Sequence, residues 1–247
     1  MEALKGIDSP FEVEAKIWEK GPEEGTPKTL TKELILGEPV YFRNTFTPNT
    51  TYCLKMRVVH QEVDTQWSDK SEFTTPEFKD LCVWKECPDY VDEENPRIAT
   101  KSGFGYCTIV GNTPIPLNKV TSWNIKVLKS WNNGDGIFIG VAPFDIDQNE
   151  DDNYDKCGWY FNCYSSSLVS GPPHGYWYKA YGPRKEEGEY VHTGDSVGVV
   201  MDTAKGELSF VLDGVNLGVA YEGIPLDKPL VPCVLLFYKR DSVELVI

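Results

Sequence analysis

The sequence predicts an all-β protein, and three patterns carry that prediction. In residues 194–202 and again in 206–218, apolar side chains recur at every second position, and turn-forming residues lie between the two runs. Residues 11–18 alternate apolar and polar side chains strictly, as a strand with one buried face does. Loops such as 21–27, rich in Gly, Pro and Glu, separate these short runs.

Length and composition are those of a globular protein with one or two domains. The chain has 247 residues, of which 40% are hydrophobic and 25% charged. No stretch approaches the roughly 18 uninterrupted apolar residues that a membrane span needs. Residues 1–6 lack the apolar segment of a secretory signal, so we expect a cytoplasmic or nuclear location.

The charge balance disfavours nucleic acids and anionic membranes as partners. The formal net charge is −14, from 38 acidic and 24 basic residues, and no run of Lys or Arg is present. Such a chain repels phosphate groups at long range. Proteins with basic or neutral surfaces remain as candidate partners.

The cysteines predict neither a disulfide framework nor a metal site. There are seven of them, an odd number, and no two have the C-x-x-C spacing of zinc ligands. The three histidines, His60, His174 and His192, are scattered along the chain. We therefore expect reduced thiols, with Cys53, Cys107 and Cys233 in the core, and no cofactor.

The first part of the chain contains strand-like runs at 11–18, 29–36 and 39–44. A longer run at 46–59 is followed by Trp67-Ser68 and by a short segment that ends on Thr75. The order of these features resembles the second half of a fibronectin type III domain.

This resemblance covers about residues 11–75 and implies a partial fibronectin type III module at 1–76, followed by a linker at 77–81. It implies a structural role for Tyr52 as a tyrosine corner, whose hydroxyl bonds to backbone upstream. Two strands of a complete sandwich are missing from the sequence, so we expect an open sheet edge that could associate with another strand.

From residue 82 onward, several motifs follow one another in an order that resembles the SPRY domain, of the type found in tripartite-motif and Ran-binding proteins. The motifs lie at 107–116, 122–127, 134–142, 157–161, 194–218 and 229–234. The resemblance implies an antiparallel, concanavalin-like β-sandwich over residues 82–247.

The same resemblance implies protein recognition without catalysis, through loops at one end of the sandwich. Such an adaptor could be the substrate-recognition part of a ubiquitin-ligase-like or scaffold assembly. The loops expected at that end are 89–96, 145–155, 164–178 and 237–241. The residues expected to contact the partner are Tyr90, Asp92, Glu93, Tyr164, Trp177, Tyr238 and Arg240.

The acidic loop at 145–155 begins like a calcium-binding EF-hand but departs from it at two key positions. Glu150 stands where the loop needs Gly, and Lys156 where it needs a bidentate Glu. A solvated loop, an acidic rim that faces a partner and a Ca²⁺ site remain as three interpretations.

The alternative function is a jelly roll that binds or hydrolyses carbohydrate. A retaining glycosidase needs two carboxylates about 5 Å apart on rigid strands, whereas the acidic run at 186–189 lies among loop signals. No nucleophile elbow or phosphate-binding loop is present either. The sequence therefore predicts a protein that is not an enzyme.

The aromatic residues divide into two groups by their surroundings. Trp123, Phe138, Trp159 and Phe210 lie on predicted strands, where we expect them in the core. Others lie among Gly, Pro and Asn, where an aromatic side chain can anchor an interface or pack down on the sandwich. These are Trp131, Trp177, Tyr178, Tyr181 and Tyr238.

Overall fold

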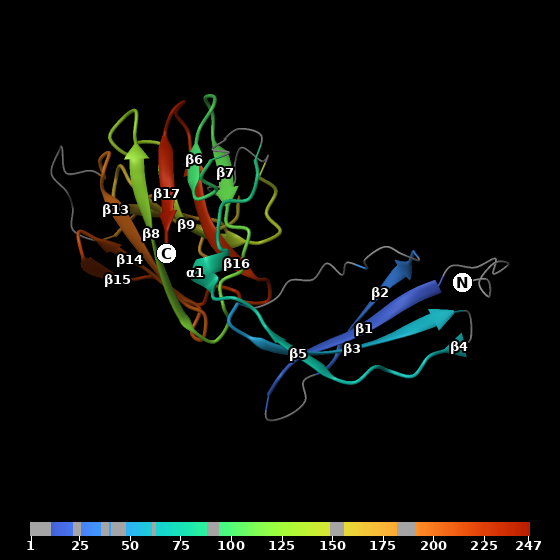
Figure 1. Cartoon of the computed structure of the whole chain (residues 1–247). Coiled ribbons are helices and arrows are strands. Elements are labelled where there is room, and N and C mark those ends of the chain that lie inside the picture. Colours follow the sequence, from blue (N-terminus) through green and yellow to red (C-terminus); the bar gives the residue numbers. More distant parts are fainter. Residues whose placement is uncertain are drawn as a thin grey trace. The chain divides into compact units, whose positions relative to one another are not determined.

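The computed structural model describes residues 11–21, 26–35, 40, 48–60, 63–87, 94–148, 156–181 and 191–247. The chain divides into two compact units, Met1–Glu77 and Phe78–Ile247. Regular structure in both is almost entirely antiparallel β (Figure 1), so the all-β prediction is confirmed. Among the described residues, no helix is both long and apolar enough to cross a membrane.

The first unit is built on one antiparallel sheet of five strands, in the order β2-β1-β3-β4 with β5 also paired to β3. The strands are β1 (Phe11–Glu19), β2 (Lys28–Leu34), β3 (Thr51–His60), β4 (Val63–Asp64) and β5 (Ser71–Thr74). On β1, the alternation seen in the sequence buries Val13, Ala15 and Ile17. The predicted strand at 39–44 falls almost wholly outside the described residues.

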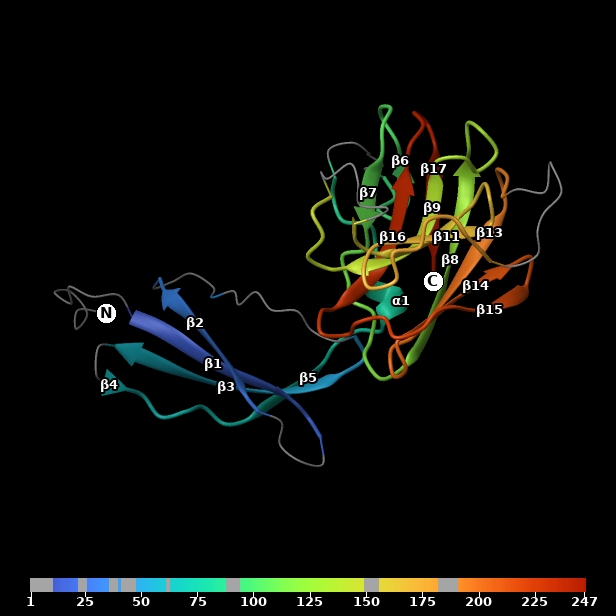
Figure 2. The same ribbon diagram turned by 180° about the vertical axis from the view of Figure 1, so that it is seen from behind.

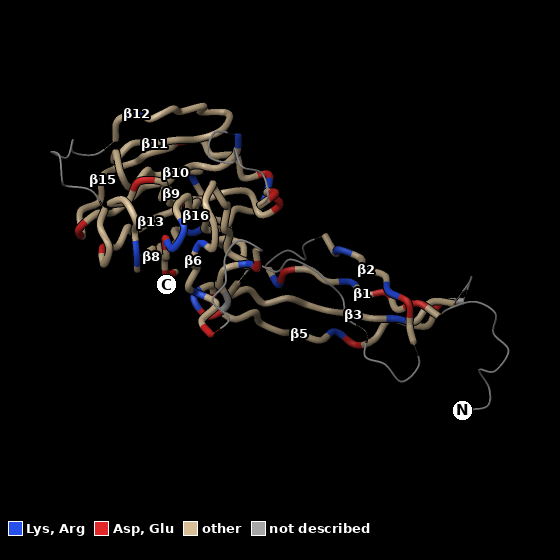
Figure 3. The backbone as a smooth tube through the Cα atoms, turned by 90° about the horizontal axis from the view of Figure 1, so that it is seen from above, with Lys and Arg blue, Asp and Glu red and all other residues tan. Residues whose placement is uncertain are grey.

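Charged and aromatic side chains organise the other face of this sheet. Trp67 is held between two cations, with Lys16 Nζ 4.5 Å and the Arg57 guanidinium 4.7 Å from the ring centroid. Arg57 also forms ion pairs with Glu14, at 2.7 Å, and with Asp64. Figure 3 shows both signs of charge along these strands. Each contact is modest, but together they brace the segment around Trp67 on β3.

The tyrosine corner stays a prediction, as does the fibronectin type III identity of this unit. Tyr52 is buried, and its hydroxyl donates a hydrogen bond to Glu19 Oε1 at 3.3 Å. The backbone at 41–47, to which a tyrosine corner would bond, lies outside the described residues. Strand β2 forms one edge of the sheet, which is the position that edge association would use.

The second unit consists of two six-stranded antiparallel sheets (Figures 1 and 2). The first sheet has the order β12-β11-β10-β9-β16-β7. Its strands are β7 (Cys107–Val110), β9 (Ile137–Pro143), β10 (Trp159–Asn162), β11 (Ser167–Ser170), β12 (Lys179–Ala180) and β16 (Leu230–Leu236).

The second sheet has the order β15-β14-β13-β8-β17-β6. Its strands are β6 (Ile98–Thr100), β8 (Val120–Lys129), β13 (Ser196–Asp202), β14 (Glu207–Leu212), β15 (Val215–Tyr221) and β17 (Ser242–Val246). The hairpin of β13 and β14 is the pattern that first predicted an all-β chain.

A large hydrophobic core contains residues from both sheets, among them Trp123, Trp159 and Phe210, as the sequence predicts. Phe138 is buried too, but in a second cluster that includes Tyr160, Val231 and Leu235 of the same sheet. The first sheet therefore buries both of its faces, and this explains why β16 is buried at every position and shows no alternation.

The linker predicted at 77–81 is wrong for most of its length. Phe78–Leu81 forms a short helix, α1, that belongs to the second unit. Phe78 is 6% exposed, and its ring centroid lies 6.2 Å from that of Trp123. The charged residues of this segment are typical of a linker, but burial of the Phe78 side chain stabilises its packing in the second unit.

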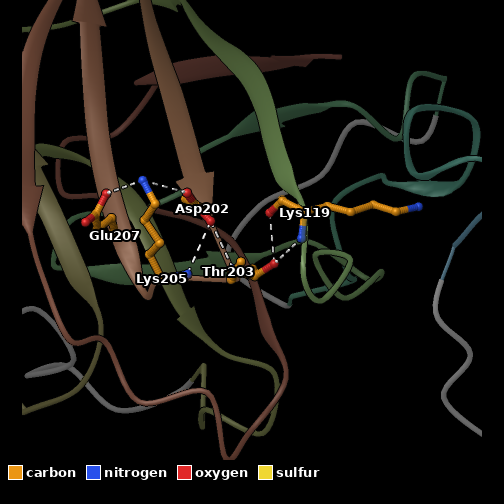
Figure 4. Close-up of polar contacts among 6 residues, drawn as sticks. Lys119, Asp202, Thr203, Lys205 and Glu207 are labelled. Atoms are coloured by element: carbon orange, nitrogen blue, oxygen red, sulfur yellow. Dashed lines mark hydrogen bonds and ion pairs between the residues drawn. The ribbon is translucent and has the colours of Figure 1, made fainter.

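The turn between β13 and β14 is held by two side chains (Figure 4). Asp202 Oδ1 accepts hydrogen bonds from the N–H groups of Ala204 at 3.0 Å and Lys205 at 3.3 Å. The buried Thr203 hydroxyl lies 2.7 Å from the Pro116 carbonyl oxygen and 2.9 Å from that of Lys119, and it accepts the Lys119 N–H at 3.1 Å. Thr203 thus ties the turn to the segment that leads into β8.

We expect Thr203→Val to lower the free energy of unfolding by about 1–3 kcal/mol, because it leaves buried backbone groups without their partner. Lys205→Ala is the matched control on the same turn. Lys205 is 65% exposed and pairs with Asp202 and Glu207 at 3.7 and 3.8 Å, so its loss should cost less than about 0.5 kcal/mol. Urea unfolding of both variants tests this, and equal losses would contradict it.

All seven cysteines are free thiols, and each of them except Cys157 is buried. Burial raises the pKa of the Cys82 and Cys233 thiols to about 12. At neutral pH these groups carry almost no thiolate, which is the reactive form.

Iodoacetamide at pH 8 should therefore modify Cys157 first in the folded protein, while the buried thiols react only after unfolding. Mass spectrometry of peptides from a timed reaction, with a urea-unfolded sample as control, measures the order. Early modification of Cys82 or Cys233 would contradict the buried, protonated state described above.

Candidate binding surface at one end of the second unit

Three connections between the two sheets emerge at the same end of the second unit. They are 101–106 between β6 and β7, 130–136 between β8 and β9, and 237–241 between β16 and β17. Strand pairing sets this arrangement, because Ser242 lies opposite Thr100 and Lys129, while Leu236 lies opposite Cys107 and Ile137. The three loops meet at the top of this unit in Figure 1.

The turn at 163–166 joins the same group of loops. Cys163 donates its N–H to the Ile137 carbonyl at 3.0 Å and accepts one from Val191 at 3.3 Å. We call these three connections, the turn 163–166, Lys129 and residues 191–195 the loop end.

Asp241 holds the loop end together. Its side chain is fully buried and accepts the N–H of Trp131 at 2.8 Å on one oxygen and the N–H of Tyr238 at 3.1 Å on the other. Its backbone oxygen accepts the N–H of Lys101 at 2.9 Å. Burial raises the pKa of the Asp241 carboxyl above its ordinary value, and the two N–H donors oppose that shift. One residue therefore connects all three loops.

Tyr238 lies partly buried beside this carboxylate. Its hydroxyl donates a hydrogen bond to Asp135 Oδ2 at 2.9 Å, and that bond is the main cause of a raised Tyr238 pKa. The backbone of Gly136, at φ +75°, passes close by, and a Cβ there would stand 2.6 Å from the Cβ of Phe237. Only glycine allows these two loops to approach so closely.

Large aromatic side chains stand exposed around this frame. Phe104 is 73% exposed, Trp131 65% and Tyr164 40%. Arg240 is exposed as well, and its φ of +76° is unusual for any residue other than glycine. These side chains offer apolar contact area and positive charge on loops whose backbone is held by the hydrogen bonds of Asp241.

The loop end brings together three of the residues predicted to contact a partner, Tyr164, Tyr238 and Arg240. It does not include Trp177, which precedes β12 and is 59% exposed. The neighbouring Tyr176 accepts the N–H of Ser170, and this places Trp177 beside the far end of β11, away from the turn at 163–166. Tyr90, Asp92 and Glu93 lie outside the described residues.

The prediction that the loops 89–96 and 145–155 share an end with 237–241 is wrong for their described parts. Phe144, at the start of the acidic loop, donates its N–H to the Pro229 carbonyl oxygen just before β16, whereas 237–241 follows the other end of that strand. The Arg97 carbonyl oxygen, just after the loop 89–96, accepts the N–H of Leu245 near the end of β17, whereas 237–241 precedes that strand. Both loops therefore start or finish at the opposite end.

The described part of the acidic loop has a structural role. Phe144 and Ile146 pack on the second hydrophobic cluster, and Asp145 pairs with Lys228 at 2.8 Å. Gln148 accepts the Val110 N–H at 3.4 Å and donates to the Glu86 carbonyl at 3.3 Å. In the described part of the chain, no three His, Cys, Asp or Glu residues cluster as metal ligands.

The list of expected contact residues omitted Phe104, Trp131 and Asp241. Phe104 is flanked by Gly103 and Gly105, and Trp131 precedes Asn132-Asn133-Gly134, so the loop signal that selected Tyr238 applied to both. Asp241 carries no such signal, because its role depends on a contact with a residue 110 positions earlier.

Comparison with known proteins gives a family and a set of similar folds. The family model of the SPRY domain matches residues 120–246, which span β8 to β17. The search of curated proteins found no match to the chain.

Three solved structures illustrate the similarity. The SPRY domain of human HERC1 is 19% identical with a TM-score of 0.49, covering 61% of this chain and 87% of that one. A human SPRY domain is 14% identical with a TM-score of 0.49, covering 66% and 96%. The PSpry domain of TRIM65 is 13% identical with a TM-score of 0.47, covering 68% and 90%.

The family match extends over just more than half of the chain, and the strands it covers form most of the two-sheet sandwich described above. The chain belongs to the SPRY domain family, whose members are protein–protein interaction modules.

Proposed function

We propose that this protein binds a partner protein or peptide through the loop end and performs no catalysis. The observation that carries the proposal is a set of exposed aromatic side chains, Phe104, Trp131 and Tyr164, on loops joined by the buried carboxylate of Asp241. Aromatic side chains of this kind supply large contact areas for a small loss of conformational entropy.

Preorganisation strengthens this case. A flexible loop must be ordered when a partner binds, and that ordering subtracts from the affinity. Here the hydrogen bonds of Asp241 order the backbone of Trp131 and Tyr238 during folding. Binding then needs to restrict only the exposed side chains.

The wider role we propose is that of an adaptor in the cytoplasm or nucleus, such as the substrate-recognition part of a ligase-like or scaffold assembly. The net charge of −14 supports a protein partner over a nucleic acid or an anionic membrane. The first unit, as a partial fibronectin type III module at 1–76, would supply a second surface through its edge strand β2.

We expect Trp131→Ala to weaken binding at least tenfold, about 1.4 kcal/mol or more, while the free energy of unfolding changes by less than about 1 kcal/mol. The probes are peptides selected from a random dodecapeptide phage library on the wild-type protein, with affinities measured by calorimetry. Trp177→Ala is the matched control, since it removes a similarly exposed indole outside the loop end. Selected peptides that ignore Trp131, or that depend equally on Trp177, would contradict the proposal.

We expect Asp241→Ala to lower the free energy of unfolding by about 2–5 kcal/mol, because the N–H groups of Trp131 and Tyr238 lose their acceptor. Asp227→Ala, at an exposed position outside the loop end, should change it by less than about 0.5 kcal/mol. Denaturant unfolding measures both. An Asp241→Ala protein as stable as the control would mean that Asp241 does not hold the loops.

A further inference from the structure

We infer that the loop end binds an acidic segment of its partner, in which Asp or Glu side chains pair with Arg240 beside an apolar anchor. This inference rests on the proposed function and adds the chemistry of the ligand. The net charge of −14 favours basic or neutral partners for the protein as a whole, whereas the ligand inferred for this one surface is acidic.

The described carboxylates of the loop end are all engaged within the protein. Asp135 accepts hydrogen bonds from Tyr238 and, at 3.1 Å, from Asn132 Nδ2. Asp195 accepts the backbone N–H of His192 at 2.7 Å. Asp241 is buried beneath the loops. Each of these carboxylates therefore accepts a hydrogen bond from the same loops, and Asp241 is buried whereas Asp135 and Asp195 are partly exposed.

Lys101 of the loop end is buried, whereas the other three Lys and Arg side chains there are exposed. Lys129, Lys239 and Arg240 are exposed, and their side chains form no ion pair with any residue in the described part of the chain. Elsewhere in the described chain, Lys20, Lys70, Lys205 and Lys228 each form an ion pair with a carboxylate. Three exposed cations without ion pairs favour an acidic ligand at the loop end over a basic one.

The backbone of Arg240 supports a specific use of its side chain. A left-handed φ disfavours every residue with a Cβ, and glycine would adopt φ +76° without that strain. The conformation is imposed from two sides, because Arg240 donates its N–H to the Lys101 carbonyl and Lys101 donates to that of Asp241, both at 2.9 Å. Strain of this kind is typical of functional positions.

The neighbouring side chains define the rest of the ligand. An arginine can hold a carboxylate through two parallel hydrogen bonds, which fixes the orientation of an acidic side chain. The exposed rings of Phe104 and Trp131 then accept an apolar side chain from the same segment. Three cations in an acidic protein are few for a nucleic acid, whose affinity comes from many phosphate contacts.

The dodecapeptides selected on the wild-type protein test this inference. We expect Asp and Glu to outnumber Lys and Arg in the selected sequences, and replacement of the acidic residues of the tightest peptide by Asn and Gln to weaken binding at least tenfold. Raising NaCl from 50 to 300 mM should weaken binding of the acidic peptide several-fold and leave the amide version nearly unchanged.

Two substitutions at one position separate binding from folding. Arg240→Glu should weaken binding of the acidic peptide at least tenfold. Arg240→Gly should weaken this binding as well. The thermal unfolding midpoint of the Arg240→Gly protein should equal or exceed that of the wild type, because glycine relieves the backbone strain. Lys205→Glu, on the β13–β14 turn outside the loop end, is the charge-matched control and should change affinity less than twofold.

The outcomes distinguish this inference from the proposed function. Neutral or basic peptides that bind through Trp131 would overturn the acidic ligand and leave peptide recognition standing. An absence of any peptide that depends on Trp131 would overturn the proposed function itself. Displacement of the acidic peptide by an equal concentration of a 20-nucleotide single-stranded DNA would assign the exposed cations to a nucleic acid and overturn the inference.

Discussion

The buried carboxylate of Asp241 accepts hydrogen bonds from two connections that run between the sheets, and its own backbone accepts a third. The connections 101–106, 130–136 and 237–241 each pass from one sheet to the other, and without a common partner each would be an independent loop. A buried charge is costly unless it is fully hydrogen-bonded. At Asp241 that cost is offset by charge-assisted bonds to backbone N–H groups, which also set where Trp131 and Tyr238 stand.

Much of the fold could be predicted from the sequence, because a strand with one buried face shows its alternation directly. Strands β1, β8 and β14 each follow that pattern. The first sheet is buried on both faces, so β16 appears in the sequence only as a continuous apolar run. Such a run is consistent with a strand but does not show which side of it faces the core. The short helix at Phe78–Leu81 escaped prediction, since a single Phe78 among charged neighbours carries no periodic signal.

The candidate site was harder to predict, for a reason of geometry. Loop composition selected Tyr238, whereas Tyr164 was selected through the loops that the resemblance to the SPRY domain implies. Composition does not say at which end of a sheet a loop lies. The end at which a loop lies depends on how strands far apart in sequence pair with one another. This pairing places Trp177 and the acidic loop away from Tyr164 and Tyr238. The contact between Asp241 and Trp131 is of the same long-range kind.

The residues that fix the loop end and the residues that it exposes are different sets. Asp241 and Gly136 are buried and determine the backbone, whereas Phe104, Trp131, Tyr164 and Arg240 point outward. Mutations in the second set can therefore accumulate at little cost to folding, as they do in antibody loops on a constant framework. For an engineer, these four positions are a small library in which a new specificity could be selected while the scaffold remains unchanged.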